Sequence, residues 1–262
     1  MLIQYTIRSL VFALGLLASV SAFAAAVIET ASGQVRAGPT ALTATAVTVG
    51  QRIQAGSTVV TGPKAQATLR FDDGQYVLLH EHTEFRVAAY SYTKGAPAND
   101  RFGFELLRGV MRMVTAAVKP LNPRAYSVRT PQAAIGIRGT DFMLAVVNPL
   151  YISVLGGTVQ AANAAGTVGF AAGSTGFVAN AAVLAATISA AALPVAVATA
   201  FKQLGAIAVN AAGAVGATQA AAGGITPTAA LVGAAIAVGI GAALSDDDDV
   251  VTGTTAPTGT LP

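Results

Sequence analysis

The sequence predicts a mainly β protein, with many short strands in a solenoid or a twisted sandwich, followed by an Ala/Gly-rich helical region. Three observations support this fold class. Short alternating apolar runs recur between Gly, Pro, Asp and Asn residues from residue 27 to residue 160. No sustained helical period appears in that stretch. From residue 161 to residue 244 the chain is rich in Ala and Gly, and Lys202 is its one charged residue.

The N-terminus has the layout of a secretory signal peptide. Arg8 precedes an uncharged apolar run, and Ala22-Phe23-Ala24 places small residues at the end of that run. The run is short for a spanning helix, which needs about 20 apolar residues. We therefore expect residues 1–24 to be a signal peptide that is cleaved after Ala24. A retained N-terminal anchor is the alternative.

The rest of the chain divides by composition into three parts. Residues 25–160 form the expected β-domain, and residues 161–244 form the Ala/Gly-rich apolar region. Residues 245–262 are acidic and then rich in Thr, Gly and Pro, a composition typical of a disordered tail. The chain has no cysteine, which excludes disulfides, thiolate nucleophiles and Cys-based metal centres.

The strand predictions start from one hairpin. Residues 65–71 alternate small or apolar side chains with polar ones, and Asp72-Asp73-Gly74 then supplies a turn, because Asp-Gly readily takes a positive φ. Residues 75–79 and 84–90 resume the strand pattern. Further strands of ordinary length are predicted at residues 102–107, 110–114, 126–129, 142–147 and 151–155.

The Ala/Gly-rich region contains two apolar runs of helical composition. Residues 177–201 lack charge and are rich in Ala, with Pro194 as a break or kink. Residues 225–244 are just long enough to span a membrane, but the acidic run 246–249 lacks the Lys and Arg that mark a cytoplasmic end. Two interpretations stay open for residues 177–244: a packed, self-associating helical hairpin, or membrane contact.

Charge and motifs favour a binding protein over an enzyme. Residues 27–160 hold 13 Lys/Arg and 8 Asp/Glu, a balance of 13 − 8 = +5, but the basic residues are scattered singly and no nucleic-acid partner is expected. No nucleophile elbow, phosphate loop or dinucleotide fingerprint occurs, so we expect neither catalysis nor a cofactor. His80 and His82, two apart on a predicted strand, are candidate metal ligands; a solvated strand edge is the alternative.

Five segments, in order, resemble the FecR domain family. They are residues 49–62, 69–74, 106–112, 128–142 and 151–159, within a resemblance that covers residues 33–160. The family-motif positions in this chain are Gly50, Gly56, Thr61, Asp73, Gly74, Gly109, Thr130, Pro131, Arg138, Gly139, Thr140 and Gly157. The resemblance implies a β-solenoid-like or twisted sandwich fold. Gly156 departs from the family pattern, which usually has an acidic residue there.

The resemblance implies a sensing or interaction module of the cell envelope. The best-known members carry a cytoplasmic anti-sigma region ahead of one membrane helix, and export from residue 1 would leave no place for that region. We therefore expect a non-catalytic protein of the periplasm, outer envelope or surface of a Gram-negative bacterium, with an envelope protein of unknown identity as partner. A secreted scaffold or adhesin that assembles through its Ala/Gly-rich part is the alternative.

One motif residue, Arg138, has two possible roles. Its guanidinium, in the Gly-Ile-Arg-Gly-Thr segment, is expected to brace the fold by binding Asp141, Asp72 or backbone carbonyls. Ligand contact is the alternative.

Overall fold

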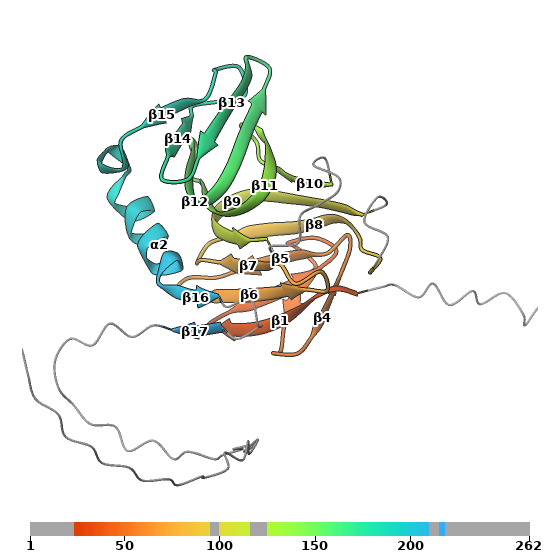
Figure 1. Ribbon diagram of the computed structural model, residues 1–262. Helices are drawn as coiled ribbons and strands as arrows, with labels where there is room; N and C mark the ends of the chain where they lie inside the picture. Colours follow the sequence, from red (N-terminus) through yellow and green to blue (C-terminus); the bar gives the residue numbers. More distant parts are fainter. Residues whose placement is uncertain (1–23, 95–99, 116–124, 210–214, 218–262) are drawn as a thin grey trace, which may run out of the picture. The chain divides into compact units, whose positions relative to one another are not determined.

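The computed structural model describes residues 24–94, 100–115, 125–209 and 215–217 (Figure 1). The signal peptide up to residue 23, the run 225–244 and the tail from residue 245 lie outside the described residues. The strands are β1 (Ala24–Ser32), β2 (Val35–Gly38), β3 (Thr45–Ala46), β4 (Arg52–Gln54), β5 (Thr58–Thr61), β6 (Gln66–Phe71), β7 (Tyr76–Leu79), β8 (Glu84–Ser91), β9 (Arg101–Val114), β10 (Tyr126–Arg129), β11 (Ala134–Val146), β12 (Leu150–Asn163), β13 (Gly166–Ala171), β14 (Thr175–Val178), β15 (Ala186–Ile188), β16 (Ile207–Val209) and β17 (Val215–Ala217). The helices are η2, a 3-10 turn (Ala190–Ala192), and α2 (Val195–Gly205).

Fifteen strands form one sheet, and its pairing divides it into two layers. In the first layer the order is β3-β2-β5-β8-β9-β10-β11-β12-β13. In the second it is β4-β1-β6-β7-β9-β11-β12-β14-β15. The long strands β9, β11 and β12 belong to both layers, because each pairs with different neighbours along its two halves.

The main core lies between the two layers. Phe104, on the first-layer half of β9, meets Phe71 of β6 edge to face, with ring centroids 5.2 Å apart. Phe104 also stacks on Phe85 of β8 at 5.7 Å. All three rings are at most 1% exposed, and such pairs add about 0.5–1.5 kcal/mol beyond the burial of their area. The two-layered arrangement confirms the predicted fold class, a solenoid-like or twisted sandwich of strands.

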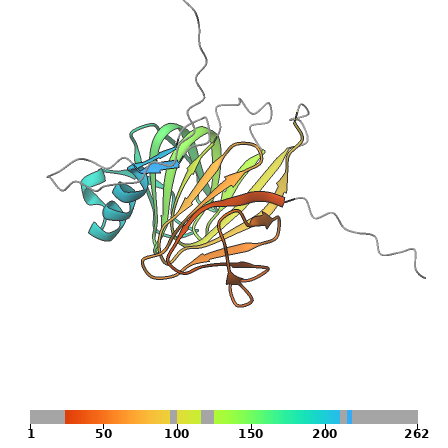
Figure 2. The same ribbon diagram turned by 90° about the horizontal axis from the view of Figure 1, so that it is seen from below.

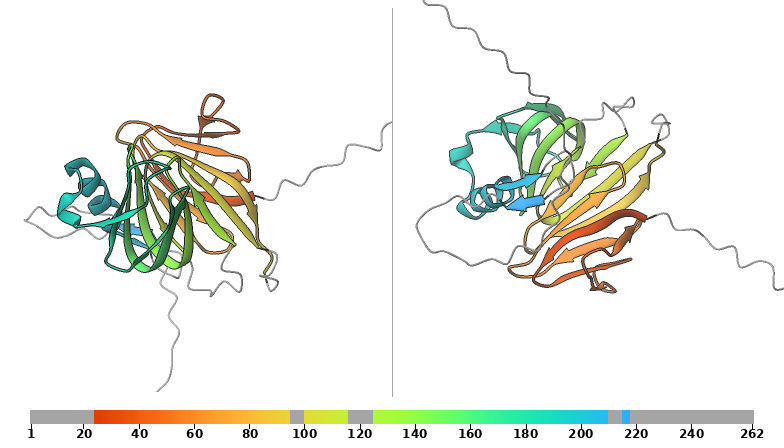
Figure 3. Two further views of the ribbon diagram at one scale, coloured as in Figure 1. Left: turned by 90° about the horizontal axis from the view of Figure 1, so that it is seen from above. Right: turned by 60° about the horizontal axis from the view of Figure 1, so that its bottom comes forward.

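A second, smaller core lies between the second layer and α2. The alternation of strand residues makes this possible, because β7 points Val77 and Leu79 into the main core and Tyr76 and Leu78 to the other side. From α2, this core takes Val197, Ala200, Phe201 and Leu204. Figures 1, 2 and 3 show α2 on one side of the strands. The outer face of the second layer is therefore covered by α2 at β7, β9, β11 and β12.

The hairpin prediction is confirmed, whereas two neighbouring predictions need correction. β6 pairs with β7 across Asp73-Gly74, and Gly74 has φ +87°. The runs 102–107 and 110–114, predicted as separate strands, are one strand, β9, which continues through Gly109 at φ +90°. A glycine in this conformation bends a strand without ending it.

The sheet continues past residue 160, where the β-domain was expected to end. β12 runs on to Asn163, and β13 and β14 complete the sheet, with Phe170 and Val178 in the main core. A helix forms over residues 195–205 and begins directly after Pro194, which agrees with the expected break at this proline. The sequence did not predict β13 and β14, because the helix propensity of Ala-rich segments is a weak effect that pairing with β12 overrides. Within the described residues, no helix is long and apolar enough to cross a membrane.

Candidate ligand-binding face

Three of the family-motif glycines lie where the long strands pass from one layer to the other. Gly109 of β9, Gly139 of β11 and Gly157 of β12 have φ values of +90°, +55° and +75°. The register of β11 against β12 shifts beside two of them, between Arg138 and Asp141. L-residues with side chains rarely adopt these φ values, so the corners of the fold depend on glycine.

Two of these corners are also too crowded for a side chain. A Cβ atom at Gly157 would overlap the carbonyl oxygen of Gly139, and one at Gly109 would overlap the backbone of Thr83. Gly56 contrasts with them, since it has φ +88° and nothing within 4 Å of the same position. The glycines at the crossings of β9 and β12 are therefore required both by conformation and by space.

The remaining motif residues support turns. Gly50 and Gly74 also have positive φ. The Thr130 hydroxyl donates to the Ala133 carbonyl at 2.9 Å and accepts from the Ala133 N–H at 3.1 Å, which closes the turn around Pro131 between β10 and β11. The Thr61 hydroxyl accepts from the Thr83 N–H at 2.9 Å. These contacts are structural and place no reactive group.

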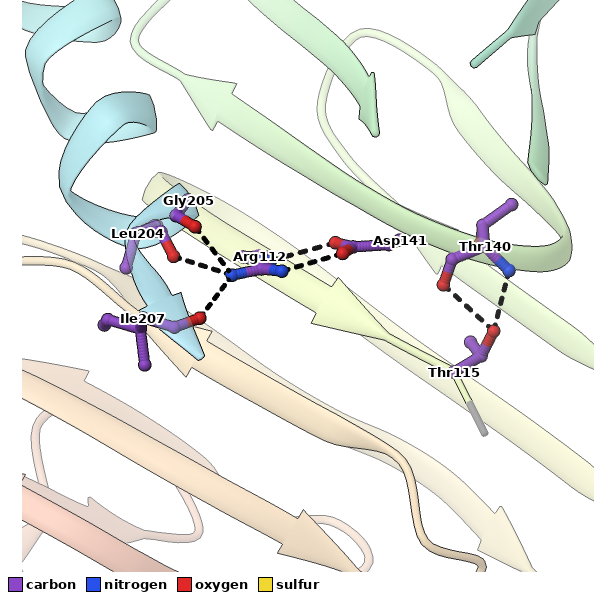
Figure 4. Close-up of polar contacts among 7 residues, drawn as sticks. All are labelled: Arg112, Thr115, Thr140, Asp141, Leu204, Gly205 and Ile207. Atoms are coloured by element: carbon purple, nitrogen blue, oxygen red, sulfur yellow. Dashed lines mark hydrogen bonds and ion pairs between the residues drawn. The ribbon is translucent and has the colours of Figure 1, made fainter. Parts of the chain in front are cut away.

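A buried arginine ties α2 to the sheet (Figure 4). The Arg112 guanidinium, on β9, donates to both carboxylate oxygens of Asp141 at 2.9 and 2.7 Å. Its Nη1 donates to the carbonyls of Leu204 at 2.9 Å, Gly205 at 3.4 Å and Ile207 at 2.8 Å. The Leu204 and Gly205 carbonyls lie at the negative end of the α2 dipole, where a cation is stabilising, and Ile207 begins β16. Bidentate pairing to a carboxylate is among the strongest hydrogen-bond arrangements in proteins.

The bracing role expected of Arg138 belongs to Arg112. Asp141 is bound by Arg112, and Asp72 is bound by Arg52 at 3.2 Å. Arg138 is exposed, and no polar partner for it is found within the described parts of the chain. The sequence contained one signal for Arg112, which is a charged residue inside the apolar strand 110–114. Whether Arg112 or Arg138 braces the fold depends on the face of the sheet that each side chain occupies. Beside this brace, Thr115 Oγ1 accepts from the Thr140 N–H at 2.8 Å (Figure 4).

Asp73 joins the two layers at the hairpin turn. Its carboxylate accepts from the Tyr126 hydroxyl at 2.8 Å and from the Tyr90 hydroxyl at 3.2 Å. Burial raises the pKa of the Asp73 carboxyl, and the tyrosine hydrogen bonds oppose that shift. Burial also raises the pKa of both tyrosines. Sequence reasoning treated Asp73 only as a turn residue and missed the tyrosines, which come from distant strands.

The two histidines lie after a strand, and not within it as had been expected. β7 ends at Leu79, so His80 and His82 lie on a turn, and His82 has φ +56°. Nε2 of His80 lies 2.6 Å from Oε1 of Gln203 on α2. Among the described residues, no group of three or more His, Asp or Glu side chains is placed to hold a metal ion.

The outer face of the first layer carries a trough of small side chains. The register aligns one residue from each of six neighbouring strands in a row that crosses them. The row consists of Ala89, Gly103, Ser127, Gly136, Gln160 and Gly169. Side chains alternate between faces along each strand, so this row points away from the main core. Six strands at about 4.8 Å spacing give the row a length of about 24 Å.

Arginines flank the trough on both sides. Two residues along each strand from the central row, Arg101 on β9 and Arg138 on β11 form one rim. On the opposite rim, Arg86 of β8 and Arg129 of β10 both face Glu105. All four arginines are exposed. Arg86 has a loose ion pair with Glu105 at 3.8 Å, and the other three have no carboxylate partner within the described residues.

A cavity confirms that this face is hollowed. It has a volume of about 420 Å³ and lies over the β8–β10 end of the row, at Ala89, Gly103 and Ser127, between Arg101 and Arg129. Its size falls within the usual range of ligand pockets, roughly 300–1,000 Å³. Asp100 also lines it, but its carboxylate is buried and accepts from the Thr93 N–H at 3.0 Å. The face combines open volume, small side chains and unpaired cations.

Comparisons with known proteins place the central segment in a family. Residues 57–160 match the family model described as FecR protein. Two crystal structures of a "putative anti-sigma factor" from Parabacteroides distasonis ATCC 8503 are similar, one with 16% identity over 50% of this chain and 59% of that chain at a TM-score of 0.42. The other has 17% identity over 56% of this chain and 64% of that chain at a TM-score of 0.44. The chain thus spans about three fifths of those structures, and no curated protein matches it.

The matched segment runs from β5 to β12 and contains the three layer crossings, the Arg112–Asp141 brace and five of the six residues in the central row of the trough. Residues 57–160 of this chain are a FecR domain.

Proposed function

We propose that this protein is exported to the cell envelope and that its FecR domain is a non-catalytic sensing or interaction module. The observation that carries the proposal is the hollow, cation-rimmed face on the matched segment. Its central row consists of Ala, Gly, Ser and Gln residues, and its charged residues are four arginines, Glu105 and Asp100. Ser127 is hydrogen-bonded to neither carboxylate: Glu105 pairs with Arg86, and Asp100 accepts from the Thr93 N–H. Such a surface suits binding and lacks the paired groups that acid–base or covalent catalysis needs.

Export is supported by the first strand as well as by the signal-peptide pattern. Ala25 and Ala26, on β1, are completely buried, and β1 pairs with β6 from Ala26 onward. Cleavage after Ala24 would leave both alanines in the core. The match to the FecR family also favours the envelope, and the family's role in regulation favours sensing.

Position-specific photo-cross-linking in cells tests the interaction proposal. A photoreactive amino acid at Ser127, in the trough, is expected to form adducts with another envelope component. The matched control is the same probe at Leu42, which is 96% exposed and precedes β3, away from the trough. Equal adducts at both positions, or none at Ser127, would contradict an interaction through this face.

One observation favours the second candidate, a self-assembling scaffold. Among the strands that the structure describes, β13 pairs with β12 alone, and its six residues, Gly166–Ala171, include no charge and no proline. Edge strands usually carry such residues to prevent pairing with another chain. A scaffold would lose assembly, measured as mass in solution by light scattering, when Thr167→Lys places a charge on this edge. A monomeric wild-type chain would eliminate this candidate.

A further inference from the structure

The geometry points to an anionic polysaccharide as the ligand of the trough, specifically a flat, ribbon-like 1,4-linked polyuronate. This inference rests on the proposed function, because it names the chemistry of what the FecR domain would sense. It starts from the order in which the four arginines occur across the sheet.

The arginines alternate between the two rims on successive strands. Arg86 on β8 and Arg129 on β10 belong to one rim, and Arg101 on β9 and Arg138 on β11 belong to the other. Neighbouring strands are about 4.8 Å apart, so one cation is presented per strand, alternately to the left and right of the trough. The four arginines carry four positive charges, and Glu105 together with the buried Asp100 beside the cavity carries two negative charges, a balance of 4 − 2 = +2.

A ribbon-like polyuronate has the complementary pattern. Each pyranose ring advances such a chain by about one strand spacing, and the equatorial linkages turn successive rings over, so that their carboxylates point to alternate sides. A guanidinium binds a carboxylate through two parallel hydrogen bonds. The small side chains of Gly103 and Gly136 let a ring lie close to the sheet, and Ser127 and Gln160 offer hydroxyl and amide groups to its hydroxyls.

Two other anionic polymers fit this face less well. An extended acidic peptide presents side chains on one side every 6.6–6.8 Å or so, out of step with cations spaced by strands. It also cannot add to the sheet as a strand here, because β9, β10 and β11 are paired on both sides. Single-stranded nucleic acid binds through aromatic stacking platforms, and the trough and its rims contain none of these side chains.

The experiment measures binding of the purified full chain to three oligomers of matched length and charge by isothermal titration calorimetry. They are β-1,4-linked oligomannuronate, which is a flat ribbon, α-1,4-linked oligoguluronate, which is buckled by its axial linkages, and oligoglutamate. We expect the mannuronate oligomer to bind most tightly and its affinity to fall with added salt. Equal binding of all three would overturn the inference in favour of general attraction to polyanions. Preferential binding of oligoglutamate would overturn it in favour of an acidic peptide.

Two variants separate charge from shape. The triple change Arg101→Gln, Arg129→Gln and Arg138→Gln should weaken mannuronate binding about 30- to 100-fold, if each exposed ion pair contributes about 3- to 5-fold. Gly136→Ile keeps every charge but fills the floor, where its Cβ would lie 3.9 Å from the nearest atoms, both on Gln160. It should also weaken binding by about tenfold or more, because the sugar ring can no longer lie close to the sheet.

The matched control has the same loss of charge away from the trough. It combines Arg36→Gln, Arg52→Gln and Arg108→Gln, which lie on β2, β4 and beyond the rim on β9. This variant should bind like the wild type, and thermal unfolding checks that every variant folds. Equal loss in both triple variants, or wild-type binding by Gly136→Ile, would overturn the inference. If no oligomer binds while Ser127 cross-links to an envelope protein, this inference fails and the proposed function stands. If the chain binds oligomannuronate but is confined to the cytosol, this inference stands and the proposed function in the envelope fails.

Discussion

Replacing Arg112 by methionine should release α2 and destabilise the whole β-domain. The side chain of Arg112 is 9% exposed, and its change to methionine leaves Asp141 without its cation and three carbonyls at the end of α2 without their donor. Removing one partner of a buried ion pair costs about 3–5 kcal/mol. Asp141 is 27% exposed and regains some hydration, so we expect the lower end, about 3 kcal/mol.

The matched control is Arg108→Met on the same strand. Arg108 donates to Glu84 at 3.2 Å, but its side chain is 63% exposed. Exposed pairs contribute about 0–1 kcal/mol. Urea unfolding should therefore give Arg112→Met a free energy of unfolding about 2 kcal/mol or more below that of Arg108→Met. A domain of this size loses about 2–4 °C in Tm per kcal/mol, so the melting temperatures should differ by roughly 4–8 °C or more.

Hydrogen exchange and a double-mutant cycle complete the test. The amides of residues 198–205 should exchange faster in Arg112→Met than in Arg108→Met, since the end of α2 is held by Arg112. Arg112→Met combined with Asp141→Leu should regain part of the loss, because no unpaired carboxylate remains. Equal unfolding free energies for the two methionine variants, within about 0.5 kcal/mol, would refute the role of Arg112 as the brace.

Three further predictions concern the turns and corners. Burial raises the pKa of the Asp73 carboxyl, so ionising this carboxyl destabilises the folded state. The unfolding free energy of the wild type relative to Asp73→Asn should therefore be highest below about pH 4 and should fall as the pH rises through the raised pKa. Urea unfolding at a series of pH values measures this difference. Gly109→Ala should cost at least about 2 kcal/mol more than Gly56→Ala, because both have φ near +90° and only Gly109 lacks space for a Cβ atom; equal melting temperatures would count against this. His80→Ala should cost about 1 kcal/mol through its lost contact with Gln203, and zinc should leave the melting temperature of the wild type unchanged, whereas a rise that His80→Ala removes would revive the metal site.

Local patterns predicted the local structure of this protein well. The hairpin at Asp73-Gly74 and the strand at residues 126–129 follow from short sequence signals, and β10 occupies those same four residues. The strands between residues 161 and 178 have no comparable signal. Their residues are mostly Ala, Gly and Thr, and they adopt strands because β12 offers them an unpaired edge.

The proposed binding face could not be predicted from the sequence, for a physical reason. Its central row takes one residue from each of six strands, and only the register of all five pairings puts Gly103, Ser127 and Gly136 side by side. A shift of one residue in any pairing would turn a different side chain outward. In the same way, Arg138 and Arg112 differ in role because the first points to solvent and the second lies under α2.

The measurement that most directly tests the central claim, an exported FecR domain, is the mass of the mature N-terminus in fractionated cells. The native gene would be expressed in a Gram-negative host, and the protein from each fraction analysed by intact mass spectrometry. We predict a chain that starts at Ala25 and occurs in the envelope fraction, since cleavage there keeps Ala25 and Ala26 in the core. A chain that starts at Met1 and occurs in the cytosolic fraction would contradict the account.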